Sequence, residues 1–174
     1  MASTAIGRRA MVRKYVEYES APAAWWSGTT VLTNQSGTVV ASLMPRPFGD
    51  PQISVGGSVV RARREGLFGK RYRLRSRRGI WSAEHHSGLR RWRIEAPSGS
   101  GRLEATSWLA DHYDLHIGKQ CVRMRRYRMF GPHYRFRGPS SILTPSLALF
   151  MLWLTTDCKR SRHGHASAAP AACP

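Results

Sequence analysis

The sequence predicts an all-β protein with one C-terminal helix: an antiparallel β-barrel of about twelve strands, made of successive hairpins around a central hydrophobic α-helix. Three observations lead to this fold class. A strand-like pentapeptide recurs through the middle of the chain, a glycine-bearing turn follows each copy, and one long apolar segment stands near the C-terminus.

The repeated pentapeptide has the pattern polar, aromatic, polar, apolar, polar. Its copies are residues 71–75 (RYRLR), 91–95 (RWRIE), 112–116 (HYDLH) and 133–137 (HYRFR). Alternation with a period of two predicts half-buried strands. Tyr72 and Leu74 therefore point to one face of the sheet, and Arg71, Arg73 and Arg75 to the other. The aromatic side chains are expected in the core.

Glycines at the turns predict that each copy starts a hairpin, because glycine accepts the backbone angles of tight turns. The turns are Gly56-Gly57, Arg78-Gly79, residues 98–101 and Gly118-Lys119, and the returning strands are 59–63, 80–84, 102–106 and 121–125. Further strands are expected at 14–18, 29–33, 38–43 and 52–55. Short strands at this spacing are typical of a sandwich or barrel, whereas a propeller blade needs about 40 residues.

The apolar segment 142–156 predicts a helix over 145–157, with Thr144 as N-cap and Pro145 in the first turn. Leu147, Phe150, Met151 and Leu154 form one stripe, and apolar residues fill the other sides. Such a helix is buried on all sides or lies in lipid. The segment spans about 22 Å, less than a bilayer core of about 30 Å, which favours a helix inside the barrel. A tail anchor over 142–156 is the alternative, since basic residues follow it.

One domain is expected over residues 12–158, between a flexible N-terminus (1–11) and a disordered basic, Ala/Pro-rich tail (159–174). No signal peptide is recognisable at the N-terminus. The three cysteines lack any paired spacing, which indicates a reducing compartment. We therefore expect a cytoplasmic protein, peripheral to the membrane if it binds lipid, and a monomer.

The hairpin repeat, the Arg78-Gly79 turn, the strand 91–94 (RWRI) and the terminal helix at 146–157 together resemble the tubby C-terminal-like superfamily. This group includes tubby proteins, phospholipid scramblases and LURP-one-related proteins, with small bacterial members. The resemblance covers about residues 12–158. It implies a twelve-stranded barrel around a hydrophobic helix, and binding of phospholipid without enzymatic activity. No basic motif of tubby proteins can be carried over residue by residue. Only Asp157 lies where scramblases have an acidic calcium segment, so calcium is not implied.

A formal net charge of +18, with 28 Lys and Arg against 10 Asp and Glu, attracts anionic partners. The candidate binding residues are arginines on the strand faces opposite the aromatic core: Arg71, Arg73, Arg75, Arg91, Arg93, Arg123, Arg125, Arg135 and Arg137. If neighbouring hairpins pair, these rows merge into one cationic stripe. An anionic phospholipid surface is the favoured partner. Nucleic acid and a solvated face without a ligand are the alternatives.

No catalytic or metal site is predicted, and no cofactor. His112 and His116 would lie about 13 Å apart on a strand, too far to share one zinc ion. Cys121 stands among arginines that would lower its pKa, but a small core residue is the simpler interpretation. Paired carboxylates, a phosphate-binding loop and a dinucleotide fingerprint are not recognisable. We therefore do not expect an enzyme.

Overall fold

The computed structural model describes residues 15–24, 28–46, 49–65, 71–86, 90–107, 109, 111–128 and 131–166, with side chains through Asp157. The N-terminal segment 1–11, predicted to be flexible, and residues 167–174, which belong to the predicted disordered tail, lie outside the described residues.

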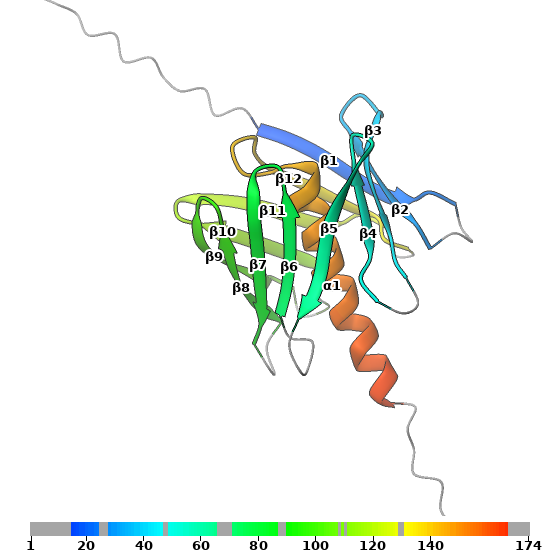
Figure 1. Ribbon diagram of the computed structural model, residues 1–174, viewed down its shortest axis with the longest axis vertical. Helices are drawn as coiled ribbons and strands as arrows, with labels where there is room; N and C mark the ends of the chain where they lie inside the picture. Colours follow the sequence, from blue (N-terminus) through cyan, green and yellow to red (C-terminus); the bar gives the residue numbers. More distant parts are fainter. Residues whose placement is uncertain are drawn as a thin grey trace, which may run out of the picture.

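Twelve antiparallel strands close into one barrel in which every strand pairs with its neighbours in sequence, and β1 closes the ring against β12 (Figure 1). This confirms the predicted fold class. The strands are β1 (Tyr15–Pro22), β2 (Thr30–Asn34), β3 (Val39–Met44), β4 (Gln52–Val55), β5 (Ser58–Glu65), β6 (Arg71–Ser76), β7 (Gly79–His85), β8 (Arg91–Ala96), β9 (Gly99–Ala105), β10 (His112–Ile117), β11 (Gln120–Arg126) and β12 (Tyr134–Pro139).

The predicted alternation of buried and exposed residues is present in the repeated strands. In β6 and β8 the aromatic and aliphatic side chains are buried and the arginines exposed. One turn differs from the prediction: β9 already begins at Gly99, so that Gly101 lies inside the strand. A Cβ at Gly101 would collide with the backbone carbonyl oxygen of His116 on β10, which explains why glycine is needed there.

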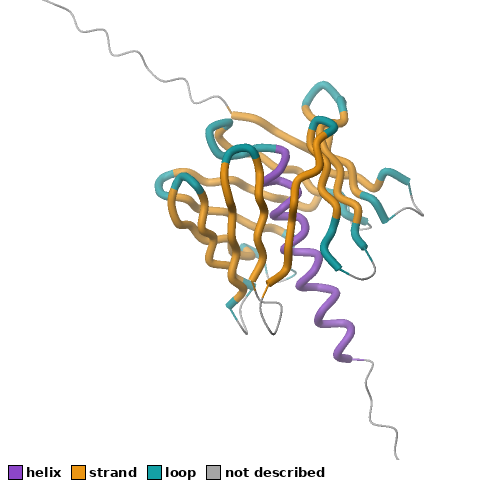
Figure 2. The backbone as a smooth tube through the Cα atoms, viewed as in Figure 1, coloured by secondary structure: helices purple, strands orange, loops and turns teal. Residues whose placement is uncertain are grey.

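The apolar helix α1 (Pro145–Ala166) runs through the barrel and projects beyond one end of it (Figure 2). Every side chain of the segment 147–154 is buried, including the predicted stripe of Leu147, Phe150, Met151 and Leu154. These residues and the inward faces of the strands form one hydrophobic core. The helix therefore fills the barrel, and each completes the core of the other.

The helix continues to Ala166, so its backbone includes the first part of the segment predicted to be a disordered tail from residue 159. After Pro145 no proline occurs before Pro170, and cationic residues suit the C-terminal end of a helix. In the described part of the chain, no helix combines the length and the apolar character that crossing a membrane requires.

Candidate anion-binding site

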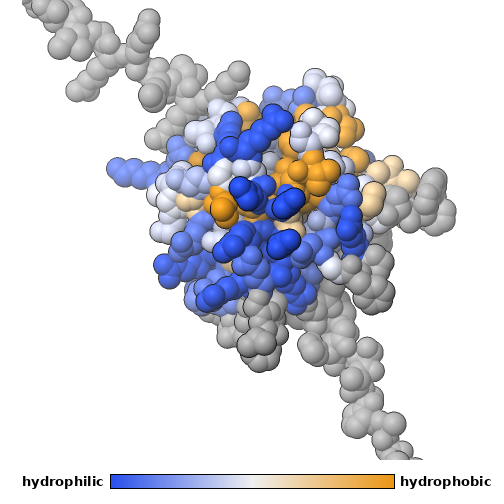
Figure 3. Space-filling model, viewed as in Figure 1, coloured by the Kyte–Doolittle hydropathy of each residue, from blue (hydrophilic) through white to orange (hydrophobic). Residues whose placement is uncertain are grey.

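The nine arginines predicted to bind anions all lie at outward-facing positions of the barrel. Eight are exposed, and Arg125 is half-buried. Figure 3 shows one face of the molecule, on which hydrophilic side chains surround a smaller hydrophobic area. The alternation in the sequence therefore correctly predicts that these nine arginines face outward from the barrel.

The arginine rows do not merge into the predicted single stripe. β7 separates β6 from β8, and it presents Ile80, Ser82 and Glu84 between them. Within the described strands, arginines stand directly opposite each other on three strand pairs, β5–β6, β8–β9 and β11–β12. The opposed pairs are Arg61 with Arg75, Arg63 with Arg73, Arg93 with Arg102, Arg123 with Arg137, and Arg125 with Arg135.

Acidic side chains of the barrel neutralise most of these arginines. The ion pairs are Arg71–Glu84, Arg73–Glu65, Arg91–Glu104, Arg93–Glu95, Arg125–Asp114 and Arg135 with both Glu17 and Glu19. The contact with Glu19 is a hydrogen bond of 2.6 Å, and it raises the pKa of Arg135. Among the described residues, Arg75, Arg123 and Arg137 form no such pair. Most of the predicted rows are therefore balanced within the protein itself.

A cavity of about 760 Å³ opens at the end of the barrel where α1 begins, and one of the three unpaired arginines, Arg75, lines it. We call it the arginine cavity. Its lining comprises Val55, Gly56, Ser58, Val59, Val60, Arg61, Arg75, Ser76, Arg77, Arg78, Thr144, Pro145 and Ser146. Four arginines line it, and no acidic side chain of the described chain does.

Two of the four arginines are fixed by neutral partners. Arg77 donates from Nη2 to Oγ of Ser58 at 3.3 Å, and Arg78 donates from Nη1 to the carbonyl oxygen of Ser141 at 3.5 Å. Arg61 and Arg75 face each other across the β5–β6 pair. Like charges in this arrangement are destabilising unless an anion offsets them. The cavity thus concentrates positive charge that the described protein leaves uncompensated.

The start of α1 adds the positive end of the helix dipole to the cavity. Oγ1 of Thr144 accepts a 3.2 Å hydrogen bond from the backbone N–H of Leu147, as expected of an N-cap. Pro145 has no N–H to donate. The helix end therefore contributes a favourable field rather than a set of free donors, and the arginines would make the direct contacts with an anion.

Exposed aliphatic side chains stand beside the arginine cavity. Val59 lines it and is 63% exposed, and Ile80, which is 52% exposed, lies directly opposite Arg75 on β7. No aromatic side chain is among the lining residues of the described chain. Cationic and aliphatic groups thus share one end of the barrel.

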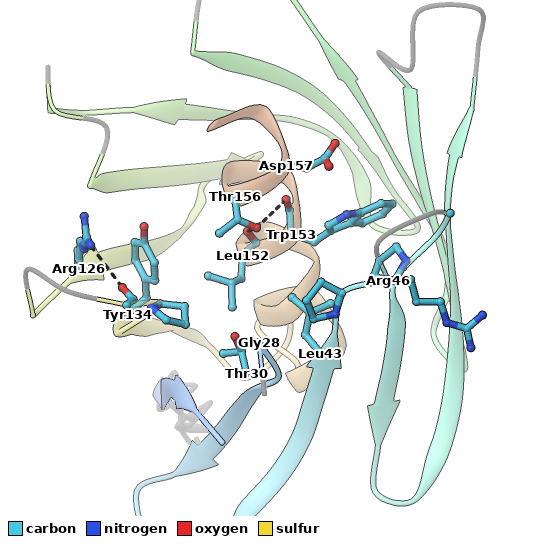
Figure 4. Close-up of a pocket in the computed structure, with 15 residues that line it drawn as sticks. Gly28, Thr30, Leu43, Arg46, Arg126, Tyr134, Leu152, Trp153, Thr156 and Asp157 are labelled. Carbon is cyan, nitrogen blue, oxygen red and sulfur yellow. Dashed lines mark hydrogen bonds between the residues drawn. The ribbon is translucent and has the colours of Figure 1, made fainter. Parts of the chain in front are cut away.

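A second cavity, of about 430 Å³, lies toward the opposite end of the barrel (Figure 4). Trp153, Thr156 and Asp157 of α1 line it, together with residues of β2, β3 and β12. Its one carboxylate is already engaged, because Asp157 pairs with Arg64 at 3.4 Å and accepts a hydrogen bond from Tyr72 at 3.0 Å. This cavity offers no pair of carboxylates for acid–base chemistry within the described residues.

Cys121 differs from both interpretations that the sequence allows. It lies half-buried on the outward side of β11, opposite His116, and so is not a core residue. Burial and the nearby carboxylate of Asp114 raise the pKa of the thiol, although Arg123 and Arg125 act in the other direction. The alternative interpretation, a thiol pKa lowered by arginines, does not hold either, because desolvation of the thiolate outweighs their effect.

Three of the cavity arginines, Arg61, Arg77 and Arg78, are absent from the set predicted from sequence. Arg77 and Arg78 form the hairpin turn between β6 and β7, and Arg61 lies on a return strand. The Arg77-Arg78 dipeptide, at a turn next to an arginine-rich strand, was the sequence feature that could have indicated these cavity residues.

The chain matches no protein-family model, no curated protein and no solved structure. The tubby-like resemblance therefore stays a prediction from the sequence pattern.

Proposed function

We propose that this protein binds anionic phospholipid headgroups through the arginine cavity, as a binding protein rather than an enzyme. The observation that carries the proposal is the opposition of Arg61 and Arg75 in a cavity that no acidic side chain of the described residues lines. Bound phosphate is the natural counter-charge, because guanidinium groups grip phosphate oxygens in pairs. The dipole of α1 favours the same charge.

The exposed aliphatic side chains favour a membrane surface over nucleic acid as the source of the phosphate. Val59 and Ile80 would enter the apolar part of the interface while the arginines hold headgroups. Single-stranded nucleic acid is usually bound by stacking on aromatic side chains, and the described lining has none. A duplex would gain nothing from the aliphatic groups.

A vesicle co-sedimentation assay tests the proposal with two double variants of equal charge. Arg61→Ser with Arg75→Ser removes the opposed pair of the cavity. Arg91→Ser with Arg93→Ser removes two arginines that are paired with Glu104 and Glu95 on another part of the barrel. We expect the first variant to lose at least about tenfold in affinity for vesicles containing phosphatidylserine, and the second to bind like the wild type.

Equal losses in both variants would show that net charge alone attracts the protein, and absence of binding to anionic vesicles would refute the proposal. A third variant, Val59→Asn with Ile80→Asn, separates the sources of phosphate. Weaker vesicle binding with unchanged duplex binding supports the membrane. Tight duplex binding with a steep salt dependence, together with weak vesicle binding, would favour nucleic acid instead.

A further inference from the structure

The hairpin formed by β10 and β11 brings three different metal-binding side chains together on the outer face of the barrel. His116 stands directly opposite Cys121, two positions from the turn at Gly118, and Asp114 lies on the same face of β10. One donor atom from each of Asp114, His116 and Cys121 lies within 4.8 Å of the other two. These strands are not those of the arginine cavity, so the cluster stands independently of it.

The three donors are held in a fixed frame. β10 and β11 are paired along their whole length, and each is also paired on its other side, with β9 and β12. The positive φ of Gly118 closes a tight turn that sets the register of His116 and Cys121. Only side-chain rotations are needed to bring the donors to a common ion, because a tetrahedral zinc ion with bonds of about 2.0–2.3 Å spaces its ligands roughly 3.3–3.8 Å apart.

The environment of Asp114 is unusual for a surface carboxylate. Its Oδ1 atom is shielded from solvent and lies 2.6 Å from Nη1 of Arg125, yet this contact lacks hydrogen-bond geometry. That Nη1 instead donates to the carbonyl oxygens of Tyr113 and Met124. The carboxylate is thus close to a cation without receiving a hydrogen bond at this oxygen from the described residues. A shielded carboxylate oxygen without a hydrogen-bond donor is one that a metal ion can satisfy.

We propose that Asp114, His116 and Cys121 bind a zinc ion, with a fourth coordination position open to solvent. One carboxylate oxygen, one imidazole nitrogen and one thiolate sulfur form a donor set that suits Zn²⁺. His116 is exposed and the other two side chains are half-buried, so an ion can enter from the solvent. The Cys121 thiol passes its proton to water when the sulfur binds the metal. Metal binding would replace the contact of Arg125 with Asp114 and the hydrogen bond of Arg123 with Cys121.

Titration with Co²⁺ tests the site, because a thiolate bound to cobalt gives a charge-transfer band in the near ultraviolet. The full-length chain is used with Cys158→Ser and Cys173→Ser, which leaves Cys121 as its single thiol. We expect the band to appear at one equivalent of Co²⁺ and to vanish on addition of Zn²⁺. Cys121→Ser abolishes the band. His116→Ala and Asp114→Asn each weaken cobalt binding at least about tenfold.

His112→Ala is the matched control, since His112 lies on the same face of β10 but outside the cluster. It leaves the titration unchanged if the proposal is correct. Absence of the band in the single-thiol protein would overturn the proposal, as would equal losses in the His112 and His116 variants. Zn²⁺ should also raise the melting temperature of the single-thiol protein and not that of the Cys121→Ser variant, which separates lost binding from lost folding.

Discussion

The hydroxyl of Tyr72 donates a 3.0 Å hydrogen bond to Oδ2 of Asp157, which ties β6 to α1 near the end where the helix leaves the barrel. Nη1 of Arg64 on β5 lies 3.4 Å from the same oxygen. The ring of Tyr72 also packs edge-on against Trp153, with centroids 5.2 Å apart. Helix and strands are therefore joined by polar contacts as well as by the hydrophobic core.

Removal of the Tyr72 hydroxyl is expected to lower the free energy of unfolding by about 0.5–1.5 kcal/mol. Tyr72→Phe keeps the ring contact with Trp153 and deletes only the donor to Asp157. Urea unfolding measures the effect. Glu95→Ala is the control, because the exposed Arg93–Glu95 pair should change stability by less than about 0.5 kcal/mol. Equal stability of Tyr72→Phe and the wild type would show that the hydrogen bond has no net effect.

The alternation of residues along each strand made the barrel and its core predictable, because burial of one strand face depends only on local sequence. Trp92 and Ile94 are buried and Arg91 and Arg93 exposed, as the pattern of residues 91–95 indicates. The helix was predictable for a similar reason, since a segment that is apolar on all sides needs a surrounding shell.

The candidate sites depend on contacts between strands and were less predictable. Arg61 meets Arg75 only because of the register between β5 and β6. In the barrel, β7 lies between β6 and β8, so the arginines of these two strands do not form one continuous row. The pairing of His116 with Cys121 could have been found, because the two-residue turn at Gly118-Lys119 places them opposite each other. No feature of the sequence near Asp157 indicates that it contacts Arg64 and Tyr72, because these residues lie on strands far away in the sequence.

Substitution of Gly101 is expected to disrupt the contact between β9 and β10. A Cβ at this position meets the backbone oxygen of His116 and the side chain of Ile117. Backbone cannot move aside as a side chain can, so Gly101→Ala should cost at least about 2 kcal/mol in the free energy of unfolding. Ser100→Ala, at the neighbouring exposed position, should change it by less than about 0.5 kcal/mol. Similar stabilities of the two variants would contradict the close approach.

His133 is expected to make the protein less stable as the pH falls. Burial lowers the pKa of His133, and the positive charges of Arg128 and Arg126 lower it further. Its Nδ1 atom is buried without a hydrogen-bond partner among the described residues. Below a pH of about 6.5 the unfolded chain therefore binds a proton that the native imidazole does not yet accept, and stability declines toward the lower native pKa.

An NMR titration of the His133 ring measures this pKa directly. Arg128→Gln should raise it toward the ordinary value, whereas Arg77→Gln, at the opposite end of the barrel, should leave it unchanged. The variant His133→Gln should lose less stability than the wild type between about pH 6.5 and pH 5. A titration at or above the ordinary histidine value would show that the ring is solvated and charged in the native state.

Truncation of Phe150 tests whether the barrel depends on its internal helix. The side chain is fully buried in the first half of α1, and its ring lies 6.1 Å from that of Trp153. Phe150→Ala should lower the free energy of unfolding by about 3–5 kcal/mol, since no other side chain can fill the space inside a closed ring of strands. Val59→Ala, at an exposed position on β5, should lower it by less than about 0.5 kcal/mol.

Urea unfolding followed by tryptophan fluorescence and by far-ultraviolet circular dichroism should give coincident transitions, because strands and helix share one core. If the loss for Phe150→Ala were below about 1 kcal/mol, or if the two signals changed at different urea concentrations, the strands would be stable without the helix.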